Sequence, residues 1–385
     1  MKKPEKIQIL QIITNLELGG AQKHALSLIK YLDRSKYKVH FISAPQGLLL
    51  KEAQAVSDVQ LCLLSTLNRR ISPVNDIKSL LFIVKYIKQY NIQIVHTHSS
   101  KAGIIGRWAG YIAGGRAIIH TVHGWSFNDY QGMFLKNFYV FLERITAKIT
   151  TAFIAVARHD IRKGLQHQIG REKQYNLIHY GIEINTDISS AQKTQAKKEL
   201  GIDSIKVCVG MIACLKPQKN PLDFIRLASQ MRVKHPEVMF ISAGEGILRD
   251  SMRALIKEKK LESRVKLCGW RKDIETILAI SDIIVLTSLW EGMPIALLEA
   301  MAFSKPIAAY ASDGVKEMIL DGENGYLIQP RDVSSLSAKV DFLLSNPVQT
   351  DLMRAKARAF FETPIFRVQH MLEKTHQLYQ ACLGK

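Results

Sequence analysis

Residues 283–302 read IIVLTSLWEGMPIALLEAMA: an apolar run, a polar loop and a second apolar run. The first run, Ile283–Thr287, predicts a strand, and Pro294 predicts the start of a helix because proline is favoured in a first helical turn. Gly292 has no Cβ, so the backbone there can approach a ligand closely. The free N–H groups of the first turn and the positive end of the helix dipole form a site for phosphate. The stretch therefore predicts a strand–loop–helix unit that binds an anion.

Two carboxylates flank this helix start. Glu291 precedes the helix and Glu299 lies about two turns inside it, so the two bracket the helix start over about 10 Å. Glu291 could simply cap the helix and Glu299 could be solvated, but Glu299 stands among apolar residues, where a carboxylate without a role is costly. A carboxylate accepts strong hydrogen bonds from vicinal hydroxyls. We therefore expect one carboxylate on a sugar and the other on a ribose, with a diphosphate between them.

The rest of the chain alternates short apolar runs with segments of helical period, such as Ala21–Leu32, Ile77–Gln89 and Phe134–Ala147. This alternation predicts an α/β fold with parallel sheets that are covered by helices on both faces. The other strands are expected at Ile7–Thr14, Lys38–Ser43, Ile92–Thr97, Ala117–Val122, Ala152–Val156, Tyr175–His179, Val207–Ala213, Val238–Ala243, Val265–Cys268 and Pro306–Ala309.

A polar segment near residues 183–204 interrupts the pattern and predicts a domain boundary. We expect an N-terminal Rossmann-like, acceptor-binding domain at 1–185 and a C-terminal Rossmann-like, nucleotide-sugar-binding domain at 186–365. Residues 366–385 predict a final amphipathic helix that packs back toward the N-terminal domain. Doubly wound domains bind ligands at the carboxyl ends of their strands, so a cleft between the two domains is the expected site.

The formal charge of +19 is concentrated in the first half of the chain. Residues 1–185 carry 25 Lys+Arg against 11 Asp+Glu, whereas residues 186–385 carry 28 against 23. The excess indicates an anionic partner such as a membrane surface or a lipid-linked phosphate, although a merely soluble basic surface remains an alternative. Phe134–Lys148 mixes aromatic and basic residues, which fits a membrane surface and an amphipathic core helix equally well.

The chain shows no signal peptide and no apolar run near the roughly 20 residues of a spanning helix. Its five cysteines have no C-x-x-C spacing, which excludes a zinc knuckle and fits a reducing cytoplasm. We therefore expect a cytoplasmic protein with possible peripheral contact at the inner membrane face. His96 and His98 share one strand face, but no carboxylate is spaced to complete a metal site, so no metal is expected.

The spacing of Glu291 and Glu299 matches the E-x7-E signature of retaining glycosyltransferases with the GT-B fold, and the chain resembles family 4 of those enzymes over essentially its whole length. The family's other motifs are matched by Gly19-Gly20-Ala21-Gln22, residues 96–103 (HTHSSKAG), Thr121-Val122-His123-Gly124, Ala243-Gly244-Glu245-Gly246, residues 269–273 (GWRKD) and residues 321–326 (DGENGY).

This resemblance implies a role for each matching residue. Glu291 would hold hydroxyls of the donor sugar, Lys219 would neutralise the diphosphate, and His123 would lie beside the transferred sugar; these three are the expected catalytic residues. Glu299 would hold the ribose, and main chain near Arg271 would contact the base. The full set of expected donor-binding residues is Gly19, Gly20, Gly244, Arg271, Gly292, Met293, Pro294, Ile295 and Glu299.

Two positions depart from the family pattern. Cys214 stands where the family usually has an arginine, so we expect the diphosphate to depart more slowly unless Lys216 or a basic residue of the N-terminal domain supplies the second cation. Ser304 replaces the usual glycine before Lys305, which we expect to be harmless.

The expected function is transfer of a sugar, with retention, from a nucleotide-diphosphate sugar (UDP favoured) to a lipid-linked glycan in cell-surface polysaccharide synthesis. No cofactor and no divalent metal is expected, because protein cations and a helix dipole serve the phosphate. A nucleotide-sugar epimerase of the same architecture is the alternative, and it would act without an acceptor. Nucleic-acid binding has only the net charge in its favour, because no recognised binding motif is present.

Overall fold

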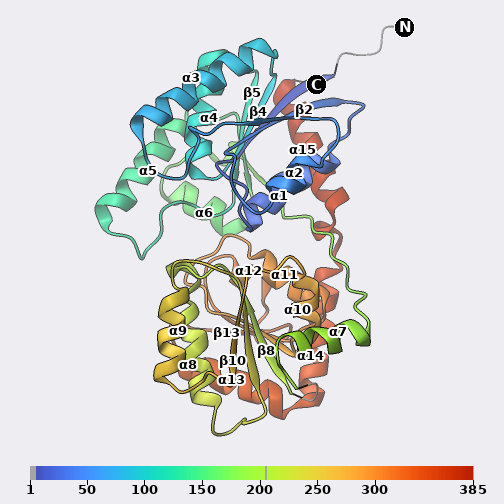
Figure 1. Cartoon of the computed structure of the whole chain (residues 1–385). Coiled ribbons are helices and arrows are strands. Elements are labelled where there is room, and N and C mark those ends of the chain that lie inside the picture. Colours follow the sequence, from blue (N-terminus) through green and yellow to red (C-terminus); the bar gives the residue numbers. More distant parts are fainter. Residues whose placement is uncertain (1–5, 204–205, 385) are drawn as a thin grey trace. The chain divides into compact units, whose positions relative to one another are not determined.

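The computed structural model describes residues 6–203 and 206–384, and its chain divides into two compact units (Figure 1). Unit 1 comprises Met1–Gly181 and Arg367–Lys385, and unit 2 comprises Ile182–Phe366. The chain thus leaves unit 1 after Gly181, slightly before the expected boundary at 185, and returns to it for the final helix.

Unit 1 is built on a parallel seven-stranded sheet with the order β3-β2-β1-β4-β5-β6-β7. Its strands are β1 (Ile7–Ile12), β2 (Tyr37–Ser43), β3 (Val59–Leu63), β4 (Ile94–His98), β5 (Ala117–Val122), β6 (Ala152–Ala155) and β7 (Tyr175–Leu177). Its helices are α1 (Gly20–Tyr31), α2 (Leu50–Gln54), α3 (Pro73–Gln89), α4 (Ser100–Ala113), α5 (Met133–Ala147), α6 (Arg158–Gln166), η1 (Glu172–Gln174) and α15 (Val368–Leu383).

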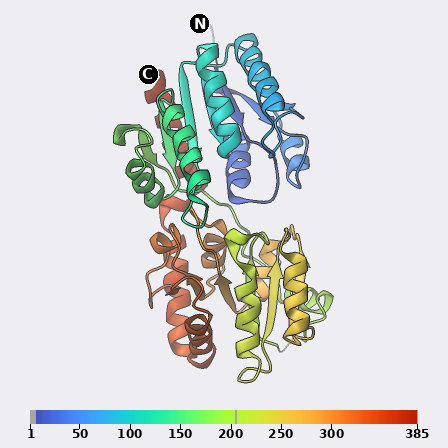
Figure 2. The ribbon, with the colours of Figure 1, turned by 90° about the vertical axis from the view of Figure 1, so that its left-hand side faces the viewer.

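Helices cover both faces of this sheet because successive strand residues point to opposite sides. Ile9 of β1 packs in a core with residues of α1 and α15, whereas Leu10 packs with residues of α3 and α4. Figure 2 shows α3, α4 and α5 side by side over one face, and α4 contacts both of its neighbours. The final helix α15 belongs to the opposite face, where Met371 and Tyr379 are fully buried.

Unit 2 repeats this plan with a six-stranded parallel sheet in the order β10-β9-β8-β11-β12-β13. Its strands are β8 (Cys208–Ile212), β9 (Met239–Ala243), β10 (Val265–Gly269), β11 (Ile283–Leu286), β12 (Ile307–Tyr310) and β13 (Tyr326–Ile328). Its helices are α7 (Ser190–Glu199), η2 (Pro217–Lys219), α8 (Pro221–Met231), α9 (Arg249–Glu258), α10 (Ile274–Ile280), α11 (Ile295–Ala302), α12 (Val315–Met318), α13 (Val333–Ser345), α14 (Pro347–Phe361) and η3 (Pro364–Phe366).

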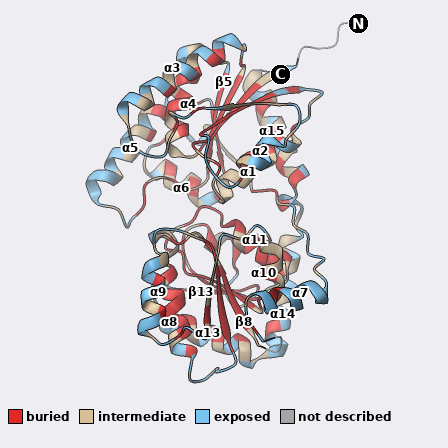
Figure 3. Ribbon diagram, in the orientation of Figure 1, coloured by how far each residue is buried: buried red, intermediate tan, exposed pale blue. Residues whose placement is uncertain are grey.

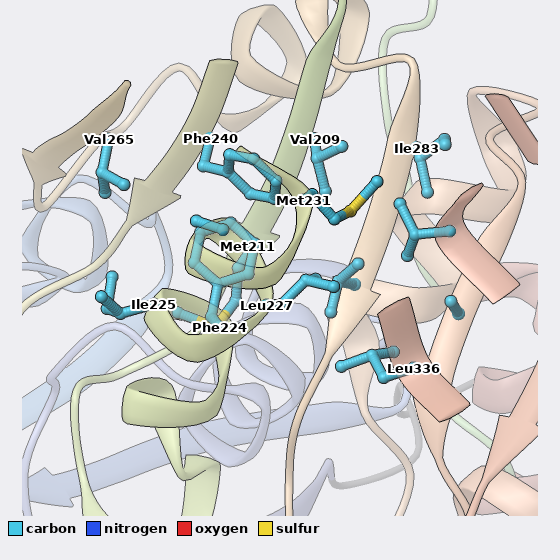
Figure 4. Packing of buried hydrophobic residues seen from close by; sticks show 14 of the residues in the cluster. Val209, Met211, Phe224, Ile225, Leu227, Met231, Phe240, Val265, Ile283 and Leu336 are labelled. Carbon is cyan, nitrogen blue, oxygen red and sulfur yellow. The ribbon is translucent and has the colours of Figure 1, made fainter. Parts of the chain in front are cut away.

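The core of unit 2 lies between its sheet and helices α8 and α13. Met211 and Phe240 from the strands meet Phe224 and Leu227 of α8, with Leu336 of α13 beside them (Figure 4). Figure 3 shows that the strands of both sheets are largely buried, as expected of parallel sheets with helices on both faces. Local sequence therefore sets up two similar scaffolds, each with its loops at the carboxyl edge of a sheet.

The predicted α/β class and all eleven predicted strands are confirmed, with ends that shift by a few residues. Two strands escaped prediction. The edge strand β3 has four partly buried residues and one exposed residue, and β13 has three residues, so neither gives a clear apolar run. The helix predicted to begin at Pro294 begins at Ile295, with Pro294 as the extended cap residue (ψ 106°). Among the described residues, no helix is both long enough and apolar enough to cross a bilayer.

Candidate active site

The loop Thr287–Pro294 connects the carboxyl end of β11 to α11, and it carries Glu291, Gly292, Met293 and Pro294. Glu291 is 7% exposed and Glu299 is 8% exposed. Residues 292–295, which follow Glu291, are also buried. Glu299 makes interactions within the protein, which is what a carboxylate in an apolar setting requires. The buried context predicted for Glu299 is thus confirmed.

Lys219 and Glu291 form an ion pair, although 72 residues separate them in the sequence. Three further bonds hold the 3-10 turn η2 against the loop. The hydroxyl of Thr287 donates to the carbonyl of Lys219 (2.9 Å), the amide of Leu289 donates to the carbonyl of Gln218 (2.8 Å), and the Gln218 side chain donates to the carbonyl of Trp290 (3.0 Å). The cation and the carboxylate are therefore held together by the backbone of two loops and not by their own attraction alone.

The start of α11 has no side-chain cap, and no acidic residue lies in its first turn. The amide of Leu297 turns back to the carbonyl of Pro294 (3.0 Å). The preceding amides at the positive end of the helix dipole have the character of an anion site, beside the ammonium group of Lys219.

Gly314, which the sequence analysis did not single out, supports this loop from a neighbouring turn. Its amide donates to the carbonyl of Glu291 (3.2 Å), and a Cβ at Gly314 would overlap the carbonyl oxygen of Gly292. Only glycine permits this approach, because every other residue carries a Cβ. A glycine in the loop between β12 and α12 gives no local signal of such a contact, so only the structure identifies it.

Gly244 and Gly246 lie at the carboxyl end of β9, with φ angles of 144° and 159°. A Cβ on Gly244 would overlap the carbonyl oxygen of Ala213, and one on Gly246 would meet that of Leu215. The β9 loop therefore lies directly along the end of β8, where Cys214 stands. The structure thus gives Gly244 a packing role in addition to the donor-binding role expected of it.

Arg271 makes a two-pronged ion pair with Asp273, through Nε (2.8 Å) and Nη2 (2.6 Å). Asp273 raises the pKa of Arg271 by accepting these bonds. This ion pair holds the Arg271 side chain against its own loop, and the resemblance implies that main chain near Arg271 contacts the base.

His123 follows β5 in unit 1, is itself partly buried, and takes part in a chain of hydrogen bonds with buried side chains. Its Nδ1 lies 2.7 Å from the hydroxyl of Tyr180, and its Nε2 lies 3.0 Å from Nδ1 of His98. The Nε2 of His98 in turn lies 2.7 Å from Oε1 of Gln11. Burial lowers the pKa of both histidines well below the ordinary value, and neighbouring histidines lower it further, so both are neutral at pH 7.

The side-chain amide of Gln11 has an acceptor oxygen and a donor nitrogen, and together they fix which group donates in every hydrogen bond of this chain. Its oxygen accepts from His98, so His98 accepts from His123, and Tyr180 donates to His123. On the other side, the nitrogen of Gln11 donates to Tyr379 (3.0 Å). The chain continues with Tyr379 donating to His96 (2.6 Å) and His96 donating to Thr121 (2.7 Å). The final helix α15 thereby helps to hold His123 in a single tautomer.

His24 of α1 lies beside this chain. Its ring contacts those of His98, His123 and Tyr180, with centroids 5.2–5.7 Å away. Both ring nitrogens of His24 are buried and find no hydrogen-bond partner among the described residues, and burial lowers its pKa to about 3. Gly19 and Gly20 stand one turn earlier, as the extended cap residue and the first residue of α1. Unit 1 therefore brings the predicted glycine loop and His123 to one edge of its sheet.

The described residues contain no group of three or more His, Cys, Asp or Glu side chains arranged to hold a metal ion.

Two family models match the chain, one in each unit. The model described as Glycosyltransferase Family 4 matches residues 18–186, and the model described as Glycosyl transferases group 1 matches residues 192–360. Among curated proteins, the chain is 32% identical over 334 residues to an Escherichia coli protein, UDP-Gal:alpha-D-GlcNAc-diphosphoundecaprenol alpha-1,3-galactosyltransferase, covering 86% of each chain. It is 29% identical over 273 residues to the putative glycosyltransferase EpsD of Bacillus subtilis, covering 68% of this chain and 70% of that one.

Solved structures match the fold over nearly the whole length. The Anabaena protein HepE in complex with UDP-glucose superposes with a TM-score of 0.84 at 20% identity, covering 97% of this chain and all of that one. WaaG, a glycosyltransferase involved in lipopolysaccharide biosynthesis, superposes with a TM-score of 0.78 at 15% identity, covering 97% and 99%. With the full-length relative and both family models, these likenesses show that the chain belongs to glycosyltransferase family 4 and has the GT-B fold.

Proposed function

We propose that this chain transfers a sugar, with retention of configuration, from a UDP-sugar to a lipid-diphosphate-linked saccharide during synthesis of an envelope polysaccharide. The E. coli relative, whose name specifies UDP-Gal, a GlcNAc-diphosphoundecaprenol acceptor and an alpha-1,3 linkage, supports UDP-galactose as the first donor to test. UDP-hexoses carry their sugar in α linkage, so an α-linked product would require net retention. We propose that the reaction takes place at the cytoplasmic face of a membrane, where the nucleotide-sugar donor meets a lipid-anchored acceptor.

The pairing of Lys219 with Glu291 beside the uncapped start of α11 carries this proposal. A diphosphate arriving at the helix start would take over the ammonium group of Lys219, and Glu291 would then be free to accept hydrogen bonds from sugar hydroxyls. Lys219 and the helix dipole would stabilise the charge that develops as the nucleotide diphosphate leaves. The site would thus exchange an internal ion pair for two contacts with the donor.

The remaining donor contacts follow the resemblance. Glu299 would accept from the ribose hydroxyls, and main chain at Arg271 would contact the base. Gly292, Met293, Pro294 and Ile295 would line the sugar and the diphosphate. Cys214 carries no positive charge at the position where the family usually has the second cation of the diphosphate clamp. We propose that Lys216, two residues further on, takes its place.

For the transfer itself we propose front-face attack. The acceptor oxygen would bond to the anomeric carbon on the side from which the diphosphate departs, and its proton would pass to the departing phosphate oxygen. Positive charge builds on the sugar ring in such a step. Because both ring nitrogens of His123 are engaged by Tyr180 and His98, we propose that His123 positions the sugar without moving a proton.

Calorimetric titration of the full chain with UDP and GDP, followed by turnover with a panel of UDP-sugars and a polyprenyl-diphosphate GlcNAc acceptor, tests the proposal. We expect preference for UDP, loss of UDP binding in Glu299→Ala, and a larger fall in turnover than in UDP affinity for Glu291→Ala. Glu258→Ala, an exposed carboxylate of α9, is the matched control. Unchanged UDP binding in Glu299→Ala would refute the ribose role.

The same assay separates transfer from epimerisation. A transferase gives a lengthened acceptor, whereas an epimerase converts the donor sugar when no acceptor is present. We further propose that no divalent metal is needed, so activity should persist in EDTA. Strict dependence on Mg²⁺ or Mn²⁺ would contradict the charge roles given to Lys219 and α11.

A further inference from the structure

Helix α5 of unit 1 turns an aromatic face toward solvent. Phe134 is 88% exposed and Met133 is 78% exposed, and Phe138 and Phe141 follow at helical spacing with 43% and 58% exposure. Figure 3 colours much of this helix as exposed. A surface helix normally buries its apolar stripe and exposes its charges. An aromatic face left in water therefore calls for a partner.

The inward side of α5 explains why the aromatic residues face outward. Glu143, 2% exposed, accepts from Nη2 of the fully buried Arg107 of α4 (2.7 Å). Thr146, also fully buried, accepts from the indole N–H of Trp108 (3.1 Å). Polar partners on α4 thus fix which side of α5 faces the protein. Rotating the helix to hide its phenylalanines would leave the charge of Arg107 buried and unpaired, which is strongly unfavourable.

The neighbouring helices extend this apolar surface. Val74, Ile77 and Leu81 lie at helical spacing on α3 and are 57–64% exposed, and Tyr111 at the end of α4 is 58% exposed. These helices lie side by side on one face of the sheet (Figure 2). We call this surface the outer face of α3–α5. By contrast, the most exposed apolar residues of unit 2, such as Val233 and Val348, lie on separate elements.

The charges on the outer face of α3–α5 are positive. The acidic residues of the three helices are Asp76, which pairs with Lys101 (2.6 Å), and Glu143, which is buried with Arg107. Exposed basic residues remain around the apolar ones, namely Lys78, Lys85, Lys88, Arg144 and Lys148. An apolar surface that is ringed by cations matches an anionic lipid headgroup layer above an acyl interior.

The position of the apolar residues is also informative. Parallel strand–helix units place the N-terminal ends of helices at the carboxyl edge of the sheet. Met133, Phe134 and Val74 lie at such N-terminal ends, so they are near the same edge of unit 1 as His123.

We propose that the outer face of α3–α5 docks on an anionic membrane surface, with Met133, Phe134, Phe138 and Phe141 inserted among the headgroups. The binding rests on exposure, packing and charge alone. Only its use, which is to bring unit 1 to an acceptor anchored in the same leaflet, rests on the proposed function.

Cosedimentation of the full chain with vesicles tests the docking. We expect binding to vesicles of phosphatidylcholine with 30% phosphatidylglycerol, and weaker binding to phosphatidylcholine alone or at high salt. The variant Phe134→Ser/Phe138→Ser/Phe141→Ser should lose at least tenfold in partition. Val233→Ser/Val348→Ser/Leu352→Ser, which removes three exposed apolar residues from unit 2, is the matched control and should bind like the wild type.

A charge variant and a folding control complete the design. Lys85→Glu/Lys148→Glu should weaken binding to the anionic vesicles severalfold and have little effect on neutral ones. UDP titration and circular dichroism report whether each variant is folded. Equal binding by the wild type and the phenylalanine variant, or no vesicle binding by the wild type, would overturn the proposal. So would a dimer that the phenylalanine variant dissociates, because a second copy would then cover this face.

Turnover separates docking from catalysis. The phenylalanine variant should lose activity on a long-chain acceptor embedded in vesicles but keep it on a short-chain acceptor in solution. Vesicle binding without any glycosyl transfer would support the docking and contradict the proposed function. Glycosyl transfer without vesicle binding would support the proposed function and contradict the docking.

Discussion

The two units share one folding plan but hold their polar side chains in different ways. Unit 1 buries a directed chain of neutral groups, including His123, His98 and Gln11, in which each member satisfies the next. Unit 2 holds opposite charges, Lys219 and Glu291, on two loops at the end of its sheet. The neutral chain fixes positions and is costly to disturb, whereas the ion pair can exchange its partners for those of a ligand. Unit 1 thus holds its polar side chains in fixed positions, whereas unit 2 holds charged side chains that can bind a ligand.

The distribution of histidines sharpens this contrast. Of the twelve histidines in the chain, only His235 lies in unit 2. Six histidines of unit 1 have pKa values held far below the ordinary value, with burial as the largest cause: His24, His40, His96, His98, His120 and His123.

Lowering the pH should therefore destabilise unit 1 much more than unit 2, and this is the largest effect that we predict. A histidine that stays neutral in the folded state contributes full stability above its unfolded pKa of about 6.5, and that stability is lost as pH falls because the unfolded chain takes up the proton. At pH 5.5, about one unit below that value, each such histidine costs on the order of 1 kcal/mol, so together they cost several kcal/mol. We expect unit 1 to open near this pH while unit 2 stays folded.

Hydrogen exchange at pH 7.5 and 5.5, corrected for intrinsic rates and resolved to peptides of each unit, measures this difference. Equal loss of protection in both units would contradict the predicted difference in acid stability, as would full protection of β4 and β5 at pH 5.5.

The buried ion pair of unit 1 should matter far more than an exposed one of unit 2. Glu143→Ala leaves the fully buried Arg107 without its partner and should lower the free energy of unfolding by about 3–5 kcal/mol. Lys234→Ala removes the exposed partner of Asp341 and should cost less than about 1 kcal/mol. Urea titration of both variants checks the ratio, and a loss under 1 kcal/mol for Glu143→Ala would show that water reaches Arg107.

Lys219→Ala tests whether the charges of unit 2 serve the reaction. Removing one preorganised charge from a leaving group costs about 10²–10³ in turnover, so we expect a fall of that size with a UDP-sugar donor. Lys234→Ala, which removes another lysine from the same unit, should keep wild-type turnover. Because Lys219→Ala also strips Glu291 of its partner, the double variant with Glu291→Gln separates folding from chemistry. Recovery of full turnover in that double variant would contradict the assigned role.

The smallest effect is expected at the end of the neutral chain. Tyr180→Phe removes one hydrogen bond to His123, which is worth about 1 kcal/mol. We expect a rise in KM for the sugar donor of less than about tenfold, with UDP affinity unchanged because UDP is assigned to unit 2. An equal loss of UDP affinity would show that His123 does not distinguish the sugar from the nucleotide.

Much of the site could be predicted because it depends on local patterns. The strand before Thr287 and the helix after Pro294 follow from a β-rich run, a polar loop and a proline, and the resulting loop carries Glu291. Gly314 gave no such signal, since its role depends on a carbonyl oxygen that approaches from another segment. The directed chain in unit 1 escaped prediction for the same reason, because Gln11, His98 and Tyr379 come from three distant elements.

Sequence by itself determined the alternation of strands and helices, the two-unit organisation and the position of the acidic motif, because backbone sterics and the periods of strand and helix act over a few residues. Tertiary structure alone decided that Lys219 pairs with Glu291 and that the phenylalanines of α5 face solvent. The aromatic pattern of α5 fits a core helix or a surface helix equally well. The choice came from Arg107 of α4, whose buried charge needs Glu143 on the inward side.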